Sequence, residues 1–166
     1  ILTATLTKND ATETKTFEVT VAQAIDEQLA AALSEAKKKA NDTLDAYNNE
    51  NGFYSDEEWC AIEQIVASAK NAINAAEQPS EVASALSSAE AQIAFMQEKK
   101  ETKNALDEYL ESYHENEYMP ENWVKIEGIL AQAKKAIDEA ATAEEMAEIV
   151  AQTKENIEAV EKAIFT

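Results

Sequence analysis

The sequence is poor in the residues that interrupt helices. It contains only two glycines and two prolines in 166 residues, while alanine, glutamate and lysine are abundant. Glycine costs a helix backbone entropy and proline removes a backbone donor, so their scarcity favours long helices. The chain also lacks an apolar run that approaches the length of a membrane span. These absences predict a mostly α-helical protein that does not insert into a membrane.

Residues that carry most enzyme chemistry are scarce as well. The only histidine is His114, with no cysteine near it in the sequence, and two glycines could hardly build a nucleophile elbow or a phosphate loop. Carboxylates abound, but acid–base pairs need a cleft that shifts their pKa values, and small helical bundles offer little of one. Asn49, Asn51 and Gly52 faintly resemble a calcium loop, yet a loop that ends a helix explains them better. We therefore expect no enzymatic activity, no metal and no cofactor.

Basic residues are outnumbered, 14 against 33 acidic ones, giving a formal net charge of −19. No basic stripe exists to neutralise phosphates, which excludes nucleic acid as a partner, and the acidity disfavours anionic membrane surfaces. Two interpretations of the acidity stay open. It serves solubility, or it attracts a basic partner.

The first residues alternate in a way the rest of the chain does not. Apolar and polar residues take turns over 2–7 and 16–21, which is the period of a strand, and the Asn-Asp at 9–10 suits a turn. We predict a β-hairpin over residues 1–22, whose apolar face needs a cover. Residues 4–21 resemble the last two strands of bacterial Ig-like domains. That resemblance implies missing Ig-like strands before Ile1 and a longer multimodular parent protein.

From about Ala24 onward the apolar residues follow helical spacing. The first stripe comprises Ile25, Leu29, Leu33, Ala36, Ala40, Leu44 and Tyr47. Start signals agree with helices: Ser55 with Glu58 forms a capping box, Thr142 with Glu145 forms another, and Ser80 is expected as an N-cap. Pro120 fits the first turn of a helix.

An internal repeat is the most informative pattern. At an offset of 64 positions Trp59 matches Trp123, and the apolar stripe stays in register without a gap from Tyr54 to Met96. Further pairs at this offset are Tyr54 with Tyr118, Ile62 with Ile126, Ala69 with Ala133, Lys70 with Lys134, Ile73 with Ile137 and Ile93 with Ile157. The first helices match at an offset of 66, as in Leu44 with Leu110 and Tyr47 with Tyr113.

The repeat predicts two tandem three-helix bundles, over residues 23–98 and 99–166, behind the hairpin at 1–22. Neither glycine nor proline occurs between Ser80 and Glu115. A continuous helix is therefore expected to run from near Ser80 through Lys100 to about Tyr113 and to make the molecule elongated. Cys60 matches Val124, so that position is expected to be buried and apolar, and acidic neighbours oppose thiol reactivity.

The pattern Tyr-x4-Trp-x2-Ile-x6-Ala-Lys-x2-Ile in both copies resembles FIVAR-type repeats of Gram-positive surface proteins and secreted glycosidases. The resemblance implies attachment, spacing or contact between modules at the cell wall or outside the cell. It names no catalytic residue.

Aromatic residues gather near the start of the second helix in each copy. We expect Tyr47 and Trp59, with Tyr113 and Trp123, to cap the core, and the tyrosine hydroxyl groups to reach water. The alternative is a glycan- or protein-binding patch on aromatics left exposed. Its candidate residues are Phe53, Tyr54, His114, Tyr118 and Met119.

Three functions remain open from the sequence. The favoured one is a non-catalytic spacer and interaction region of a secreted or cell-surface multimodular protein, such as a carbohydrate-active enzyme or an adhesin. The others are a carbohydrate- or protein-binding module that uses the aromatic loop ends, and an ancillary subunit that packs on an upstream glycosidase domain.

Overall fold

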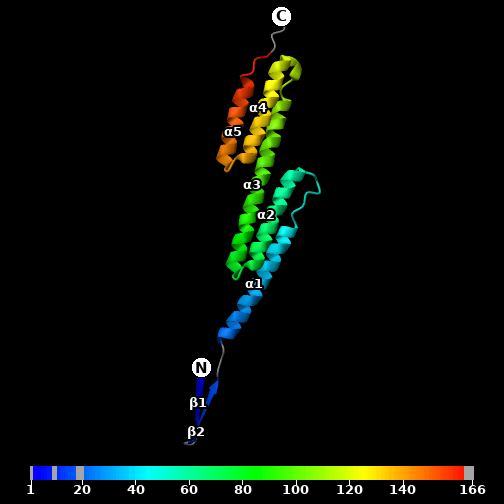
Figure 1. Ribbon diagram of the computed structural model, residues 1–166. Helices are drawn as coiled ribbons and strands as arrows, with labels where there is room; N and C mark the ends of the chain where they lie inside the picture. Colours follow the sequence, from blue (N-terminus) through cyan, green and yellow to red (C-terminus); the bar gives the residue numbers. More distant parts are fainter. Residues whose placement is uncertain (1, 9–10, 18–20, 163–166) are drawn as a thin grey trace. The chain divides into compact units, whose positions relative to one another are not determined.

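The computed structural model describes residues 2–8, 11–17 and 21–162, with side chains from residue 25 onward. The chain is mostly helical, which confirms the composition-based prediction (Figure 1). In order along the chain the elements are β1 (Leu2–Lys8), β2 (Ala11–Phe17), α1 (Val21–Asp45), α2 (Asp56–Ala75), α3 (Pro79–Glu111), the short 3₁₀ helix η1 (Glu115–Glu117), α4 (Pro120–Glu139) and α5 (Ala143–Glu158).

Strands β1 and β2 pair antiparallel, with Leu2 opposite Phe17 and Lys8 opposite Ala11. The predicted extension of the second strand to Val21 is wrong, because Val21 is the first residue of α1. Val21 lies four residues before Ile25, so it also continues the helical spacing. Val19 and the predicted turn at residues 9–10 lie outside the described residues.

Helix α3 is a single helix over Pro79–Glu111, 33 residues long. The predicted continuous helix is therefore confirmed, and it ends two residues before Tyr113. The structure corrects the expected N-cap at Ser80, which lies inside the helix. The carboxylate of Glu81 instead accepts hydrogen bonds from the backbone N–H groups of Glu77 and Gln78, at 2.7 and 3.1 Å.

The predicted capping box at Ser55 forms completely, whereas the one at Thr142 forms only in part. The Glu145 carboxylate there accepts from the backbone N–H of Ala141, at 2.7 Å, and not from that of Thr142. The backbone N–H of Ser55 donates to the Glu58 carboxylate at 2.9 Å, and the Ser55 hydroxyl accepts from the Glu58 N–H at 3.3 Å. At α5 the Thr142 hydroxyl accepts from the N–H of Glu145 at 3.2 Å. Pro120 is the first residue of α4, where a missing N–H costs nothing. Local sequence therefore sets these helix starts.

The described chain divides into two compact units. The first unit comprises residues up to 48 together with 66–89, and the second comprises 49–65 together with residues from 90 onward. In the first unit Lys70 pairs with Asp45, and Lys37 Nζ donates to the Asn74 backbone oxygen at 2.7 Å. In the second unit Lys134, which matches Lys70, pairs with Asp107 at 2.5 Å.

Burial recurs at the 64-residue offset of the sequence repeat. Ile62 and Ile126 are both 0% exposed, and so are Ile73 and Ile137. Other pairs buried in register are Ala69 with Ala133, Ala76 with Ala140, Val82 with Met146, Ala89 with Thr153 and Ile93 with Ile157. Helices α2 and α4 each have 20 residues and occupy matching positions. The two copies therefore use the same positions for their interiors.

The first apolar stripe is buried over only part of its length. Ala40 and Leu44 are buried, but Ile25 is 57% and Leu29 is 39% exposed. The first two members of this stripe therefore lie outside the buried core. Lys37 contacts Asn74, near the last residue of α2, so the turns of α1 before Lys37 lie beyond the end of α2.

Candidate functional site

The aromatic pairs at the starts of α2 and α4 form hydrophobic staples. The rings of Tyr54 and Trp59 lie 6.2 Å apart, and those of Tyr118 and Trp123 lie 6.0 Å apart. In each copy the tyrosine precedes the N-cap residue and the tryptophan is the fourth helical residue, which is the staple spacing. Both tryptophans are half-buried. The Tyr-x4-Trp motif thus fixes how the chain enters the helix.

A row of tyrosines continues from this staple in the second unit. The ring centroids of Tyr109 and Tyr113 are 5.3 Å apart, and those of Tyr113 and Tyr118 are 6.4 Å apart. The Tyr109 hydroxyl lies 2.7 Å from that of Tyr113 and donates to Glu158 at 3.0 Å. Burial and these two hydrogen bonds raise the pKa of Tyr109 above its ordinary value. These hydroxyl groups are thus bound within the protein.

Tyr118 is 6% exposed and packs against Ile126 and Ile157. The alternative that placed Tyr118 at the surface as a stacking platform is therefore wrong. Lys162 covers the ring, with Nζ 5.9 Å from its centroid, and pairs with Glu117 at 2.5 Å. The hydrogen bond from Lys162 lowers the pKa of Glu117.

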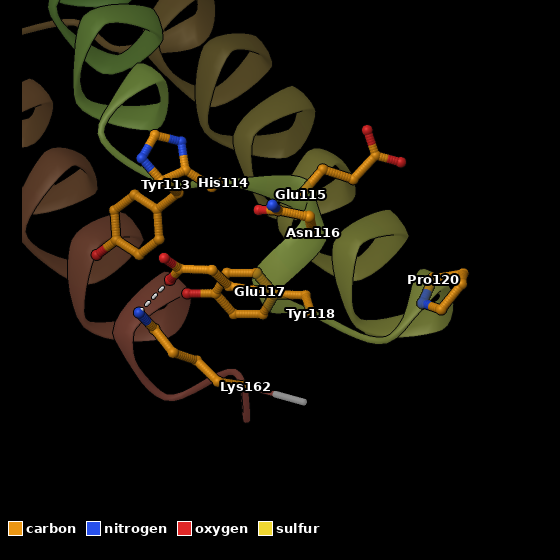
Figure 2. A pocket seen from close by; sticks show the side chains of 8 residues that line it. All are labelled: Tyr113, His114, Glu115, Asn116, Glu117, Tyr118, Pro120 and Lys162. Atoms are coloured by element: carbon orange, nitrogen blue, oxygen red, sulfur yellow. Dashed lines mark hydrogen bonds and ion pairs between the residues drawn. The ribbon is translucent and has the colours of Figure 1, made fainter. Parts of the chain in front are cut away.

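Figure 2 shows the shallow pocket beside this tyrosine. Its lining residues are Tyr113, His114, Glu115, Asn116, Glu117, Tyr118, Pro120 and Lys162. His114 is exposed and Met119, just outside the lining, is 47% exposed. The five candidate residues therefore differ in access: His114 and Met119 lie at the surface, whereas Phe53 and Tyr54 are half-buried.

The asparagine-rich loop before α2 organises itself. The Asn49 side chain donates to the Tyr54 backbone oxygen at 2.8 Å and accepts from the Tyr54 N–H at 2.9 Å. The Asn51 side chain accepts from the Phe53 N–H at 3.2 Å, and Gly52 has a φ of +66°. These amide groups close the loop, which accounts for their resemblance to a calcium loop.

The position shared by Cys60 and Val124 is not a buried apolar site. Cys60 is exposed, and Val124 is 64% exposed. Each side chain follows the half-buried staple tryptophan by one residue, about 100° around the helix, which turns it toward solvent. Cysteine and valine can therefore replace each other at this position because the side chain faces solvent.

An ion network that the sequence did not predict joins three helices of the second unit. Glu58, at the start of α2, pairs with Lys100 at 3.0 Å and with Lys103 at 2.7 Å, both on α3. Lys103 also pairs with Asp138, near the end of α4, at 2.5 Å. Burial alone would raise the pKa of Glu58, but hydrogen bonds from Lys103, Ser55 and Lys100 outweigh it and lower the pKa to about 2.

Among the described residues, no three histidine, cysteine, aspartate or glutamate side chains gather into a group that could hold a metal ion. The described helices include none with the length and apolar character needed to cross a bilayer. Comparisons of the chain with protein-family models, curated proteins and solved structures find no match.

Proposed function

We propose that the chain is a non-catalytic spacer and interaction region of a secreted or cell-surface multimodular protein, built of two tandem three-helix repeats. The observation that carries the proposal is burial in register. Ile62 and Ile73 in one copy, and Ile126 and Ile137 in the other, are all fully buried at the same offset. Each repeat has three helical segments, and α3 supplies the last segment of the first and the first segment of the second.

A shared helix suits a spacer. Continuous hydrogen bonding along Pro79–Glu111 leaves no linker at the junction of the copies, near Lys99. The pairing of Glu58 with Lys100 and Lys103 supports the junction from the side of α2. A junction without a flexible linker is what a spacer requires.

The motif also supports a FIVAR-type assignment. Both copies form the Tyr–Trp staple, and Lys70 and Lys134 of the Ala-Lys pair each bind an aspartate on a neighbouring helix. The residues that define the pattern therefore all have structural roles. For β1 and β2 we propose that they belong to an Ig-like domain, and for the chain we propose a location in the cell wall or outside the cell, as the FIVAR-type resemblance implies.

We propose no catalytic activity because the carboxylates near the tyrosine row and the helix starts are engaged in structural contacts. Glu58, Glu117 and Glu158 all bind partners within the fold, and His114 lies at an exposed turn. The competing glycan-binding function through the aromatic ends loses support because Tyr118 is buried. An ancillary role beside an upstream glycosidase domain stays compatible with a spacer.

Small-angle scattering and an activity assay together test the proposal. We expect a scattering profile typical of an elongated particle and no turnover of arabinan, hyaluronan or mucin-type glycans by the purified chain. A near-spherical particle would contradict the spacer function. Turnover that co-purifies with the chain and survives repeated chromatography would contradict the non-catalytic assignment.

A further inference from the structure

An open apolar groove runs between α3 and α5 in the second unit. Its floor contains Leu106 and Met146, which are 1% and 2% exposed, and the half-buried Val150. The full lining is Glu98, Thr102, Ala105, Leu106, Ala143, Met146, Ala147, Val150, Ala151 and Lys154. No charged group lies on the floor, so the groove offers apolar contact along two helices.

The shape of the groove suits a helix. On α5 the lining residues recur at spacings of three and four from Ala143 to Lys154, a stretch of about 17 Å. Exposed alanines, Ala105 on α3 with Ala147 and Ala151 on α5, leave room for the backbone of an added helix to approach closely. A helix laid there would complete a four-helix arrangement with α3, α4 and α5.

Charge selects the kind of helix. Exposed glutamates stand on both sides of the groove. On α3 these are Glu98, which belongs to the lining, with Glu101 and Glu108 beside the lining, and on α5 they are Glu144, Glu148 and Glu155. The one lysine of the lining, Lys154, extends over the Tyr109 ring, with its Nζ 4.9 Å from the centroid. An apolar floor between two acidic margins is complementary to an amphipathic helix whose polar face carries lysine or arginine.

We propose that the groove between α3 and α5 is the docking site for a basic amphipathic helix of a partner protein. The inference deepens the interaction part of the proposed function by naming the partner's chemistry, and its failure would leave the spacer part standing. A second copy of this chain is disfavoured as the occupant, because two chains of net charge −19 repel each other.

The first copy supplies a matched internal control. At the repeat offsets, Ser80, Ser84 and Ala91 stand where α5 has Glu144, Glu148 and Glu155. Lys39 stands where the second copy has Ala105. The equivalent surface of the first copy therefore lacks the acidic margin on one side and carries a positive charge at a lining position.

A titration with a synthetic peptide tests the proposal. The probe is a fluorescein-labelled peptide of sequence LKKLLKLLKKLLKL, and its anisotropy is measured against the full chain and against three variants. Ala147→Gln obstructs the groove, and Ala83→Gln makes the matched change in the first copy. Glu148→Lys reverses the charge of one glutamate at the margin of the groove. Circular dichroism checks that each variant folds. We expect all three to fold, because Ala147, Ala83 and Glu148 are exposed.

Binding should weaken at least about tenfold in Ala147→Gln and roughly severalfold in Glu148→Lys, and remain unchanged in Ala83→Gln. A scrambled peptide of the same composition should bind at least about tenfold more weakly. Equal binding of both peptides, or equal affinity of the two glutamine variants, would overturn the proposal. It would also be overturned if sedimentation showed the free chain to be a dimer that Ala147→Gln dissociates, since a second copy would then occupy the groove.

Discussion

Lys103 on α3 donates to Glu58 at the start of α2 across 2.7 Å, with only 14% and 15% of the two side chains exposed. Lys100 approaches the other carboxylate oxygen at 3.0 Å. Glu58 also accepts from the Ser55 backbone, so one carboxylate both caps α2 and binds α3. A half-buried group with three charged or polar partners should contribute measurably to stability.

Replacing Glu58 by glutamine keeps a capping side chain but removes the charge. We expect Glu58→Gln to lower the free energy of unfolding by about 1–2 kcal/mol at pH 7. The folded-state pKa is lowered from 4.5 to about 2, so the carboxylate stabilises the fold above pH 4.5 and ceases to do so as the pH falls through about 2. Urea unfolding of wild type and variant should therefore differ most at neutral pH and converge as acid is added.

Glu57→Gln is the matched control for this charge, because Glu57 is exposed one residue away. It should change stability by less than about 0.5 kcal/mol at every pH. A Glu58→Gln deficit that stays constant from pH 7 to pH 2.5 would show that the lost energy does not come from the ionised carboxylate.

The two glycines should respond to alanine with opposite signs. Gly52 has a φ of +66°, which alanine adopts at a cost, so Gly52→Ala should destabilise the chain by about 1 kcal/mol. Gly128 lies within α4, and an added Cβ there meets no atom within 4 Å. Gly128→Ala should therefore stabilise by about 0.5–1 kcal/mol. Thermal melts of the two variants provide the measurement, and shifts of the same sign would contradict this interpretation.

The two staple tyrosines should differ in their contribution. Tyr118 is buried against Ile126 and Ile157, so Tyr118→Ala should cost roughly 3 kcal/mol. Tyr54 is half-buried, and Tyr54→Ala should cost clearly less. Chemical denaturation followed by tryptophan fluorescence measures both. A neutral Tyr118→Ala would place that ring at the surface and restore the binding-patch alternative.

Local signals in the sequence predicted the helices well. The absence of glycine and proline between Ser80 and Glu115 predicted that α3 continues across the junction of the copies. The capping residues Ser55 and Thr142 predicted two helix starts to within a residue. These features depend on neighbours a few positions away. The repeat register likewise identified the buried isoleucines, because equal helices bury equal positions.

Features that depend on distant contacts were missed or misjudged. Glu58 and Lys103 are 45 residues apart, so only the placed helices bring them together. Cys60 was expected to be buried because valine replaces it in the second copy, but apolar type does not fix the direction in which a helical side chain faces. Ile25 fits the stripe of α1 and is exposed because α1 extends past α2.

The exposure of Cys60 makes a direct chemical prediction. A maleimide should label the native chain to completion, at a rate close to that in urea. Cys60→Ser should change stability by less than about 0.5 kcal/mol, because the side chain contributes little to the interior. If labelling occurs only in the unfolded chain, Cys60 is buried in the folded protein and this prediction is wrong.

Stiffness between the two copies is measured most directly by the distance between two spin labels on matching positions. In a Cys60→Ser background, Ala83→Cys supplies one site in the first unit, and Ala147→Cys supplies the matching site in the second unit. Both positions are exposed. If the copies share the continuous helix α3 as a stiff spacer, pulsed electron paramagnetic resonance should give one narrow distance distribution. A broad or multiple distribution would mean that the copies move independently, and it would contradict the spacer function.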